Sequence, residues 1–134
     1  GIVLAKKGGA LSKMLPAFKL CLGGPIGDGE QGMSWIHIDD MIQLILFIIR
    51  HPEISGPVNA TAPNPVSNAQ FSKSLGEALS RPAFITMPTV VLKLLMGEMS
   101  DLLTTGQFVV PKKVLAHNYR FHHPDIKSAL ESLV

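Results

Sequence analysis

The longest apolar segment of the chain runs from Met41 to Ile49 and is interrupted only by Gln43. It ends at Arg50 and is far shorter than the roughly 20 residues that a helix needs to cross a bilayer. Its apolar residues fall on nearly every face of a helix, a pattern typical of a helix surrounded by protein. A chain of 134 residues can hardly supply that surround alone, so we expect some apolar surface to meet another domain or partner.

The composition favours a single globular domain, residues 1–134. The chain is 46% hydrophobic and 16% charged, against about 25% charged residues in a typical soluble domain. Its formal net charge is only +2 and its lysines are scattered, so we expect no nucleic-acid partner and no membrane partner. The single cysteine, Cys21, excludes an internal disulfide, and a reducing, cytoplasmic location fits best.

Short apolar runs alternate with helical periodicity and predict an α/β class, mostly helical with short strands. A buried strand is predicted at Ile2–Leu4, almost at residue 1, so we expect the chain to be a fragment of a longer protein. Ser67 and Gln70 have the spacing of a capping box that opens a helix. Further strands are predicted at 33–38, 58–60 and 107–110, and helices at 11–18, 41–50, 67–79, 88–96, 98–103, 111–117 and 124–133.

The segment Gly27–Gly32 has the GxGxxG spacing of a dinucleotide-binding loop. That fingerprint requires a buried strand before it and a helix directly after it. Here Gly23, Gly24 and Pro25 precede the segment, and a strand-like run beginning at Met33 follows it. The flanks therefore favour an ordinary loop or hairpin turn over a phosphate-binding loop.

Two groups of histidines could carry chemistry. His37 with Asp39 and Asp40 could perform acid and base catalysis, but either aspartate is also well placed to cap the helix that follows, and we favour capping. His117, His122 and His123 lie near each other in sequence, but adjacent side chains in a strand point to opposite faces. No cysteine or carboxylate completes a ligand set, so we expect no metal site.

The segment from Gly27 to Asp40, the apolar helix after it and the run Gly56–Ala60 resemble the C-terminal half of extended short-chain dehydrogenases. In that family a loop and a strand lead to a histidine or tyrosine, then to an aspartate pair that opens a helix, then to a strand ending in asparagine. The closest similarity is to epimerase-like proteins of the NAD-dependent epimerase/dehydratase family, some of which are catalogued as cell-division inhibitors and carry a C-terminal domain of unknown function. Three segments carry this similarity: Ser34–Asp40, Asn59–Val66 and Leu115–Phe121.

The resemblance implies that the chain is the C-terminal, substrate-side part of a Rossmann-type protein. The N-terminal Rossmann domain, absent from this chain, would carry the glycine-rich loop, the tyrosine-lysine pair and the NADP or NAD cofactor. Tyr119 has His123 instead of a lysine at the family's spacing, so we expect no catalytic, cofactor-binding or metal-binding residue here. The expected partners are that Rossmann domain, a small-molecule substrate and a second copy in a homodimer.

By the same resemblance, Gln31, Trp35 and His37 are expected to face the substrate cleft of the complete protein. The implied function is the substrate-binding part of an NAD(P)-dependent, nucleoside-diphosphate-sugar epimerase-like oxidoreductase. Sugar-nucleotide epimerases usually carry an arginine and an aspartate where this chain has Met33 and Ser34, and loss of the guanidinium argues against a diphosphate substrate. The alternatives are a protein-interaction module linked to cell-division control and a plain structural domain.

Overall fold

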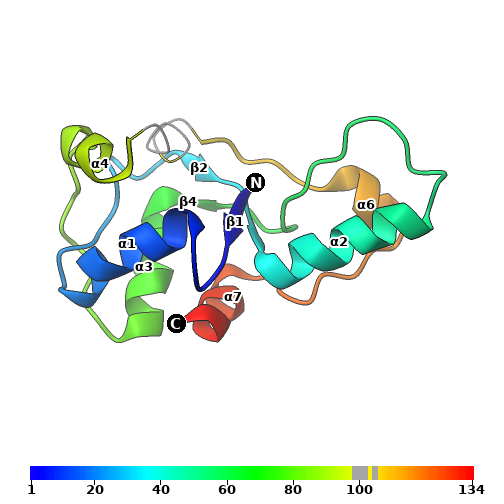
Figure 1. The fold of residues 1–134 in the computed structure, drawn as a ribbon. Coiled ribbons are helices and arrows are strands. Elements are labelled where there is room, and N and C mark those ends of the chain that lie inside the picture. Colours follow the sequence, from blue (N-terminus) through cyan, green and yellow to red (C-terminus); the bar gives the residue numbers. More distant parts are fainter. Residues whose placement is uncertain (98–102, 104–105) are drawn as a thin grey trace.

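The computed structural model describes residues 1–97, 103 and 106–134. Short strands lie in the middle of the molecule, with α7 below them, between helices α1, α3 and α4 at one end and helices α2 and α6 at the other (Figure 1). The predicted α/β class, mostly helical with short strands, is confirmed. The elements are β1 (Ile2–Leu4), α1 (Gly9–Lys19), β2 (Gly32–Met33), β3 (Trp35–His37), α2 (Ile38–Arg50), β4 (Val66–Ser67), α3 (Asn68–Leu79), α4 (Thr89–Met96), α6 (Lys112–Ala116) and α7 (Ile126–Leu133).

Strands β1 and β3 pair in parallel, with Ile2 opposite Trp35 and Leu4 opposite His37. Parallel neighbours need a crossover connection, and α1 lies in the connection between these two strands. Because side chains alternate along a strand, Trp35 and Ile36 enter different apolar clusters on the two faces of the pair.

The larger cluster joins α1, α3 and α7 to the Trp35 face of the sheet. The indole of Trp35 is fully buried. The predicted stripe on α7 is confirmed, since all four of its residues are buried. The side chains that fill the centre of this cluster include Leu11, Phe18, Trp35, Phe71, Leu75 and Leu130.

The smaller cluster lies on the Ile36 face and consists of Ile36, Leu44, Val114 and Tyr119. Helix α2 packs on it through Leu44, which is 1% exposed. As expected for a chain too short to surround this helix, several apolar side chains of α2 are exposed. Among the described residues, no helix combines the length and the apolar character needed to span a bilayer.

The predicted strand at 33–38 is broken at Ser34. Residues before the break pair antiparallel with β4, and residues after it pair with β1. The Ser34 hydroxyl donates to the carbonyl oxygen of Gln107 at 2.6 Å and accepts from the backbone N–H of Val109 at 2.8 Å. This side chain bonds one backbone group of residue 107 and one of residue 109, and the strand predicted at 107–110 does not form.

The strand predicted at 58–60 is also absent, and the chain there is irregular. Pro57 and Pro63 bracket the run, and proline cannot donate to a ladder. The backbone contact with β3 comes just afterwards, where the N–H of Ala62 donates to the carbonyl oxygen of Trp35 at 2.6 Å. The capping prediction for α3 is confirmed, since Ser67 accepts from the N–H of Gln70. The helix predicted at 98–103 lies outside the described residues, apart from Leu103.

The contrast between buried and exposed leucines gives a direct test of this core. We expect Leu130→Ala, on α7, to lower the free energy of unfolding by about 2 to 5 kcal/mol, because it opens a cavity at a side chain with no exposure. Leu94→Ala, on α4, is the matched control, because Leu94 is 82% exposed and surface changes stay within about 0.5 kcal/mol. Urea denaturation measures both, and equal losses would contradict the assigned core.

Candidate functional site

His37 ends β3 and caps α2, which begins at the next residue without an intervening loop. The imidazole Nδ1 of His37 accepts a hydrogen bond from the backbone N–H of Asp39 at 3.0 Å. The prediction that Asp39 or Asp40 caps this helix is therefore wrong. Both carboxylates lie in the first turn of α2, where they still favour the positive end of the helix dipole.

The hydrogen bonds of His37 fix its tautomer. Nδ1 accepts from Asp39 and must therefore carry a lone pair, so Nε2 carries the proton. Nε2 lies 2.8 Å from the hydroxyl oxygen of Ser132, and that hydroxyl donates its own proton to the carbonyl oxygen of Ala129. His37 is therefore a neutral donor to Ser132, and both of its nitrogens are committed to structure.

Asp40 is the charged residue at the centre of the network, and it is fully buried. One carboxylate oxygen accepts from the hydroxyl of Tyr119 at 2.9 Å and from the backbone N–H of His122 at 2.9 Å. The other accepts from the backbone N–H of His123 at 2.8 Å. Burial and this hydrogen bond raise the pKa of Tyr119, which keeps the phenol a donor. A buried carboxylate is tolerated when it is paired in this way.

Asp39 and His123 form the accessible edge of the network. The Asp39 carboxylate lies 3.8 Å from Nδ1 of His37 and 3.8 Å from Nε2 of His123. With Ile42, Gln43 and His122, these two residues line a shallow depression of about 400 Å³. Asp39 comes close to His123 because segment 119–123 returns to the start of α2.

The three side chains His37, Asp39 and His123 are close enough to suggest a metal site, since their possible ligand atoms lie within 4.8 Å of one another. A ligating imidazole directs its nitrogen lone pair in the ring plane, at about 2.1 Å from the metal. The rings of His37 and His123 are stacked, with centroids 3.8 Å apart and planes inclined by only 12°. One ion cannot lie in both planes, so this arrangement does not fit a metal ion.

General acid and base catalysis by His37 would compete with its structural bonds. Burial, with a smaller effect of His123, lowers the pKa of His37, while the carboxylates of Asp39 and Asp40 oppose that shift. Taking up a proton at Nδ1 would break the cap on the Asp39 N–H. The geometry therefore assigns His37 a structural role at the start of α2, and leaves His123 as the partly exposed imidazole beside the depression.

The three residues predicted to face a substrate all make hydrogen bonds within the chain's own fold. Gln31 donates from its side-chain amide to the carbonyl oxygens of Ile26 and Leu103, both at 3.1 Å. Trp35 donates from its indole to the carbonyl oxygen of Asn64 at 3.1 Å. Trp35 and His37 do lie on the same side of β3, since Trp35 packs in the cluster that contains α7 and His37 bonds to Ser132 of α7.

The glycine-rich segment 27–32 forms a turn that leads into β2 and not into a helix. Gly27 and Gly29 have positive φ angles of 60° and 70°, a conformation that suits glycine. The prediction of an ordinary loop is confirmed, because the helix N-terminus that a pyrophosphate would require does not follow.

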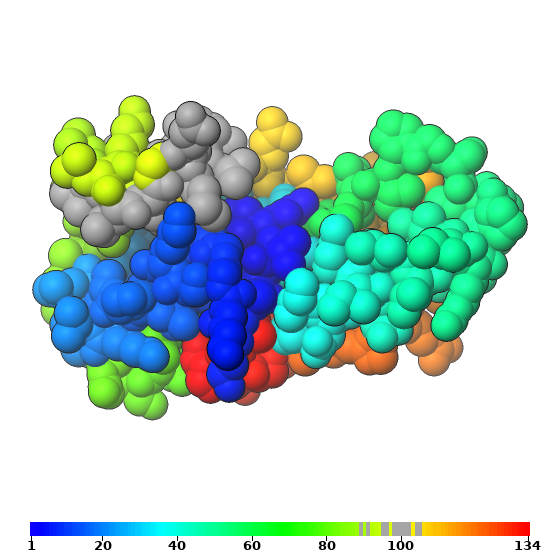
Figure 2. Space-filling view, in the orientation of Figure 1, coloured from blue at the N-terminus to red at the C-terminus, as the bar shows by residue number. Residues whose placement is uncertain are grey.

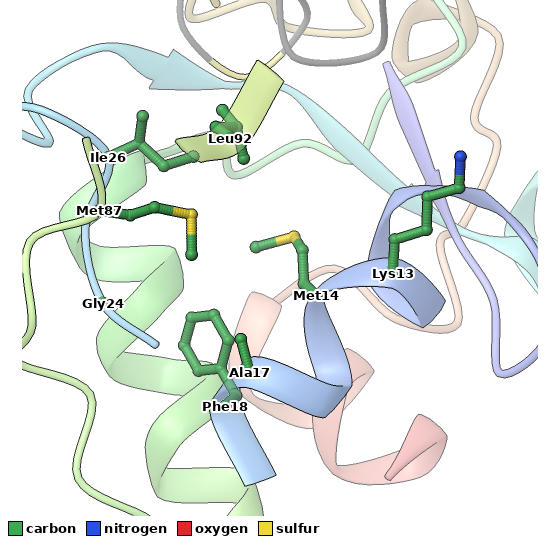
Figure 3. A pocket seen from close by; sticks show the side chains of 8 residues that line it. All are labelled: Lys13, Met14, Ala17, Phe18, Gly24, Ile26, Met87 and Leu92. Atoms are coloured by element: carbon green, nitrogen blue, oxygen red, sulfur yellow. The ribbon is translucent and has the colours of Figure 1, made fainter. Parts of the chain in front are cut away.

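An apolar notch lies between α1, α4 and the chain around Gly24. Figure 3 shows Met14, Phe18 and Met87 directed into it, with Lys13 at its side. Its volume of about 20 Å³ is room for roughly one water molecule. The notch is therefore a packing defect between helices in this structure and does not hold a ligand of substrate size.

Sequence reasoning missed Asp40, His123 and Ser132 as members of one network. One signal could have found Asp40. It lies four residues before Leu44 in the same helix, so the two side chains share the buried face of α2. The contacts with His123 and Ser132 join residues more than 80 positions apart, and no local pattern encodes them.

The two adjacent carboxylates predict very different effects of substitution. Asp40→Ala leaves two backbone N–H groups without their acceptor and leaves the Tyr119 hydroxyl only the backbone carbonyl oxygen of residue 40, at 3.3 Å, so we expect a loss of roughly 3 to 5 kcal/mol in the free energy of unfolding. Asp39→Ala is the matched control, because its side chain is 65% exposed and should cost under about 1 kcal/mol. Urea denaturation compares them, and a similar small loss for both variants would show that the Asp40 network contributes little.

The lowered pKa of His37 predicts the sign of a pH effect. The neutral ring stabilises the fold above its ordinary pKa of 6.5, and this contribution is lost as the pH falls through the lower pKa of the folded state. His37→Asn keeps a side-chain oxygen that can cap the helix but does not titrate. We expect the wild type to lose more stability than this variant between about pH 7 and pH 5, as measured by urea denaturation. Parallel pH profiles would argue against this role.

Comparison with known proteins finds similarity along the whole chain. The model of the Domain of unknown function (DUF1731) matches residues 87–133. The epimerase family protein SDR39U1 of mouse is 42% identical over 135 residues, which cover 100% of this chain and 46% of the mouse protein. The chain thus spans about half the length of the curated relatives that it matches, with coverages of 46% and 44% for mouse and Bacillus subtilis proteins.

Solved structures show the same relationship in three dimensions. The crystal structure of human epimerase family protein SDR39U1 (isoform 2) with NADPH superposes with a TM-score of 0.91 at 38% identity, covering 99% of this chain and 45% of the human one. A nucleoside-diphosphate sugar epimerase from Corynebacterium glutamicum gives a TM-score of 0.69 at 32% identity, covering 99% of this chain and 25% of the other. The chain is therefore related over its whole length to the epimerase family proteins and matches their C-terminal portion.

Proposed function

We propose that this chain is the substrate-side portion of an NADPH-dependent, epimerase-like oxidoreductase. The observation that carries the proposal is the TM-score of 0.91 to a structure solved with NADPH, of which this chain covers 45%. The glycine-rich turn at 27–32 lacks a following helix, so cofactor binding falls to the remaining portion of such a protein, a Rossmann domain. The names of the relatives give no support to the alternative function in cell-division control.

The edge of β1 is the place where that nucleotide-binding portion would join. Within the described residues, β1 pairs with β3 on one side and with no other strand. Its residues are apolar, as in strands that are covered on both faces. A further parallel strand beside β1 would extend the sheet and satisfy the backbone groups along this edge.

Gln31, Trp35 and His37 are the residues that we propose for the substrate side of the complete protein. Gln31 is half-buried, and its amide bridges two carbonyl oxygens, so a modest shift of that side chain could bring its amide to a ligand. Trp35 and His37 are buried and would act by shaping the wall of the cleft.

The positions Met33 and Ser34 bear on the class of substrate. The Met33 side chain is 1% exposed, and its sulfur accepts from the Asn68 amide at 3.4 Å. The Ser34 hydroxyl is engaged with 107–109. Neither position supplies the cation that a diphosphate requires, which supports a less charged substrate than a nucleotide sugar.

A chimera tests the proposal. The N-terminal portion of the mouse relative, fused ahead of this chain in place of its own matching residues, should bind NADPH with a dissociation constant on the order of micromolar, as judged by calorimetry. The isolated chain should bind none. Absence of binding by a folded chimera, or saturable binding by the isolated chain, would refute the division of labour proposed here.

The same chimera tests Gln31. Once a substrate is identified by NADPH oxidation with candidate carbonyl compounds, Gln31→Ala should raise KM while leaving the dissociation constant for NADPH unchanged. Gln43→Ala, in the depression on α2, is the matched control and should change neither. An unchanged KM in Gln31→Ala would remove that residue from the substrate side.

A further inference from the structure

The side-chain amide of Gln31 is held in one orientation by the chain itself. Its nitrogen donates to the carbonyl oxygens of Ile26 and Leu103, both at 3.1 Å. A primary amide nitrogen carries two protons, so these two bonds use both of them. The reverse orientation would bring the amide oxygen against two carbonyl oxygens with no proton between them. The two bonds therefore fix the nitrogen and leave the oxygen, Oε1, on the other side of the group.

The backbone that carries this amide is anchored as well. Asn68, which has no exposure, lies at the start of α3 and holds the turn at two points. Its Oδ1 atom accepts from the backbone N–H of Ile26 at 2.7 Å, and its backbone N–H donates to the carbonyl oxygen of Gln31 at 2.9 Å. Because backbone and side chain of Gln31 are both fixed, this group needs little further ordering when a ligand binds.

The Oε1 atom of Gln31 is the polar side-chain atom of residues 31–34 that has no partner within the part of the chain that the structure describes. The other two are engaged: the Met33 sulfur accepts from a side-chain amide, and the Ser34 hydroxyl both donates and accepts. Gln31 is only half-buried, so water can bond Oε1 until a ligand replaces that water. The turn thus offers a ligand an acceptor and no side-chain donor.

The charges on the same turn select against an anion. Asp28 and Glu30 are exposed, and residues 27–34 include no lysine, arginine or histidine. A phosphate or carboxylate at Oε1 would meet a further oxygen acceptor and two like charges on this turn. A ligand group that carries a proton, such as a hydroxyl or amino group, donates to Oε1 instead.

We infer that the free oxygen of Gln31 selects the substrate, and that this substrate is a carbonyl compound with a hydroxyl or amino group and without an acidic group. The inference rests on the function proposed above, in which Gln31 lies on the substrate side of an NADPH-dependent oxidoreductase. It adds the class of the substrate. A donor on the substrate replaces the water at Oε1, whereas an ether or alkyl group at the same place leaves that acceptor unpaired and binds more weakly.

Nuclear magnetic resonance of the chain itself tests the orientation of the amide. The side-chain protons of Gln31 should exchange with solvent roughly ten times more slowly than those of Gln43, because both are bonded to carbonyl oxygens. Gln43 is the matched control, since it is exposed on α2. Figure 2 shows α2, in cyan and green, on the opposite side of β1 from α4. Equal exchange in the two side chains would overturn the inference, because Oε1 would then not be held free.

The chimera with the mouse N-terminal portion tests the substrate class. At saturating NADPH, kcat/KM should be about tenfold higher for hydroxyacetone and aminoacetone than for methoxyacetone and butanone, which are of similar size and lack a donor. Gln31→Met should reduce this ratio to about two, and Gln43→Met should leave it unchanged. Comparing the ratio in each variant with that in the wild type removes the intrinsic difference in reactivity among the ketones.

Failure of the proposed function and failure of this inference give different results. A folded chimera that binds no NADPH refutes the proposed function, and with it the inference. A chimera that binds NADPH but reduces none of the four ketones, or that prefers methoxyacetone and butanone, overturns the substrate class alone. A preference that survives in Gln31→Met, with circular dichroism showing that variant folded, overturns the role of Gln31. If Gln31→Met does not fold, the wild-type preference and the proton exchange of Gln31 still decide the matter.

Discussion

The arrangement of the second half of the chain depends on one buried carboxylate, that of Asp40. It lies in the first turn of α2 and accepts from the Tyr119 hydroxyl and from the backbone N–H groups of His122 and His123. Burying a charged side chain costs several kcal/mol of folding free energy unless hydrogen-bond donors surround it. Segment 119–123 must therefore return to the start of α2, and this return delivers the chain to α7, which closes the larger cluster against α3.

The direct junction between β3 and α2 explains why a constellation that suggests catalysis is structural instead. With no loop between the elements, the last residue of the strand must cap the helix, and the Nδ1 atom of His37 does so. Its Nε2 atom then faces Ser132, and the ring stacks on His123. The same imidazole cannot also exchange protons or bind a metal without giving up the helix start.

Local patterns predicted the elements whose stability is local or whose apolar face is periodic. The stripe of α7, the Ser67 cap of α3 and the apolar run of β1 appear where the sequence placed them. The strands predicted at 58–60 and 107–110 do not form, because backbone pairing depends on distant parts of the chain. In the second segment, the Ser34 hydroxyl bonds the carbonyl oxygen of Gln107 and the N–H of Val109. His123 could not be predicted as a neighbour of His37, since Asp40 brings it there from 83 positions away.

The chain is rich in apolar residues and poor in charged ones, and two features of the fold reflect this composition. One is β1, whose pairing within the described residues involves β3 alone. The other is the outer stripe of α2, which packs on the sheet through Leu44 and faces away from it through Ile42 and Ile49. Extending a sheet consumes backbone hydrogen-bonding groups, whereas covering a helical stripe requires only a complementary side-chain surface. A nucleotide-binding portion added at β1 would meet the first requirement, and the outer stripe of α2 remains an apolar surface that the described residues do not cover.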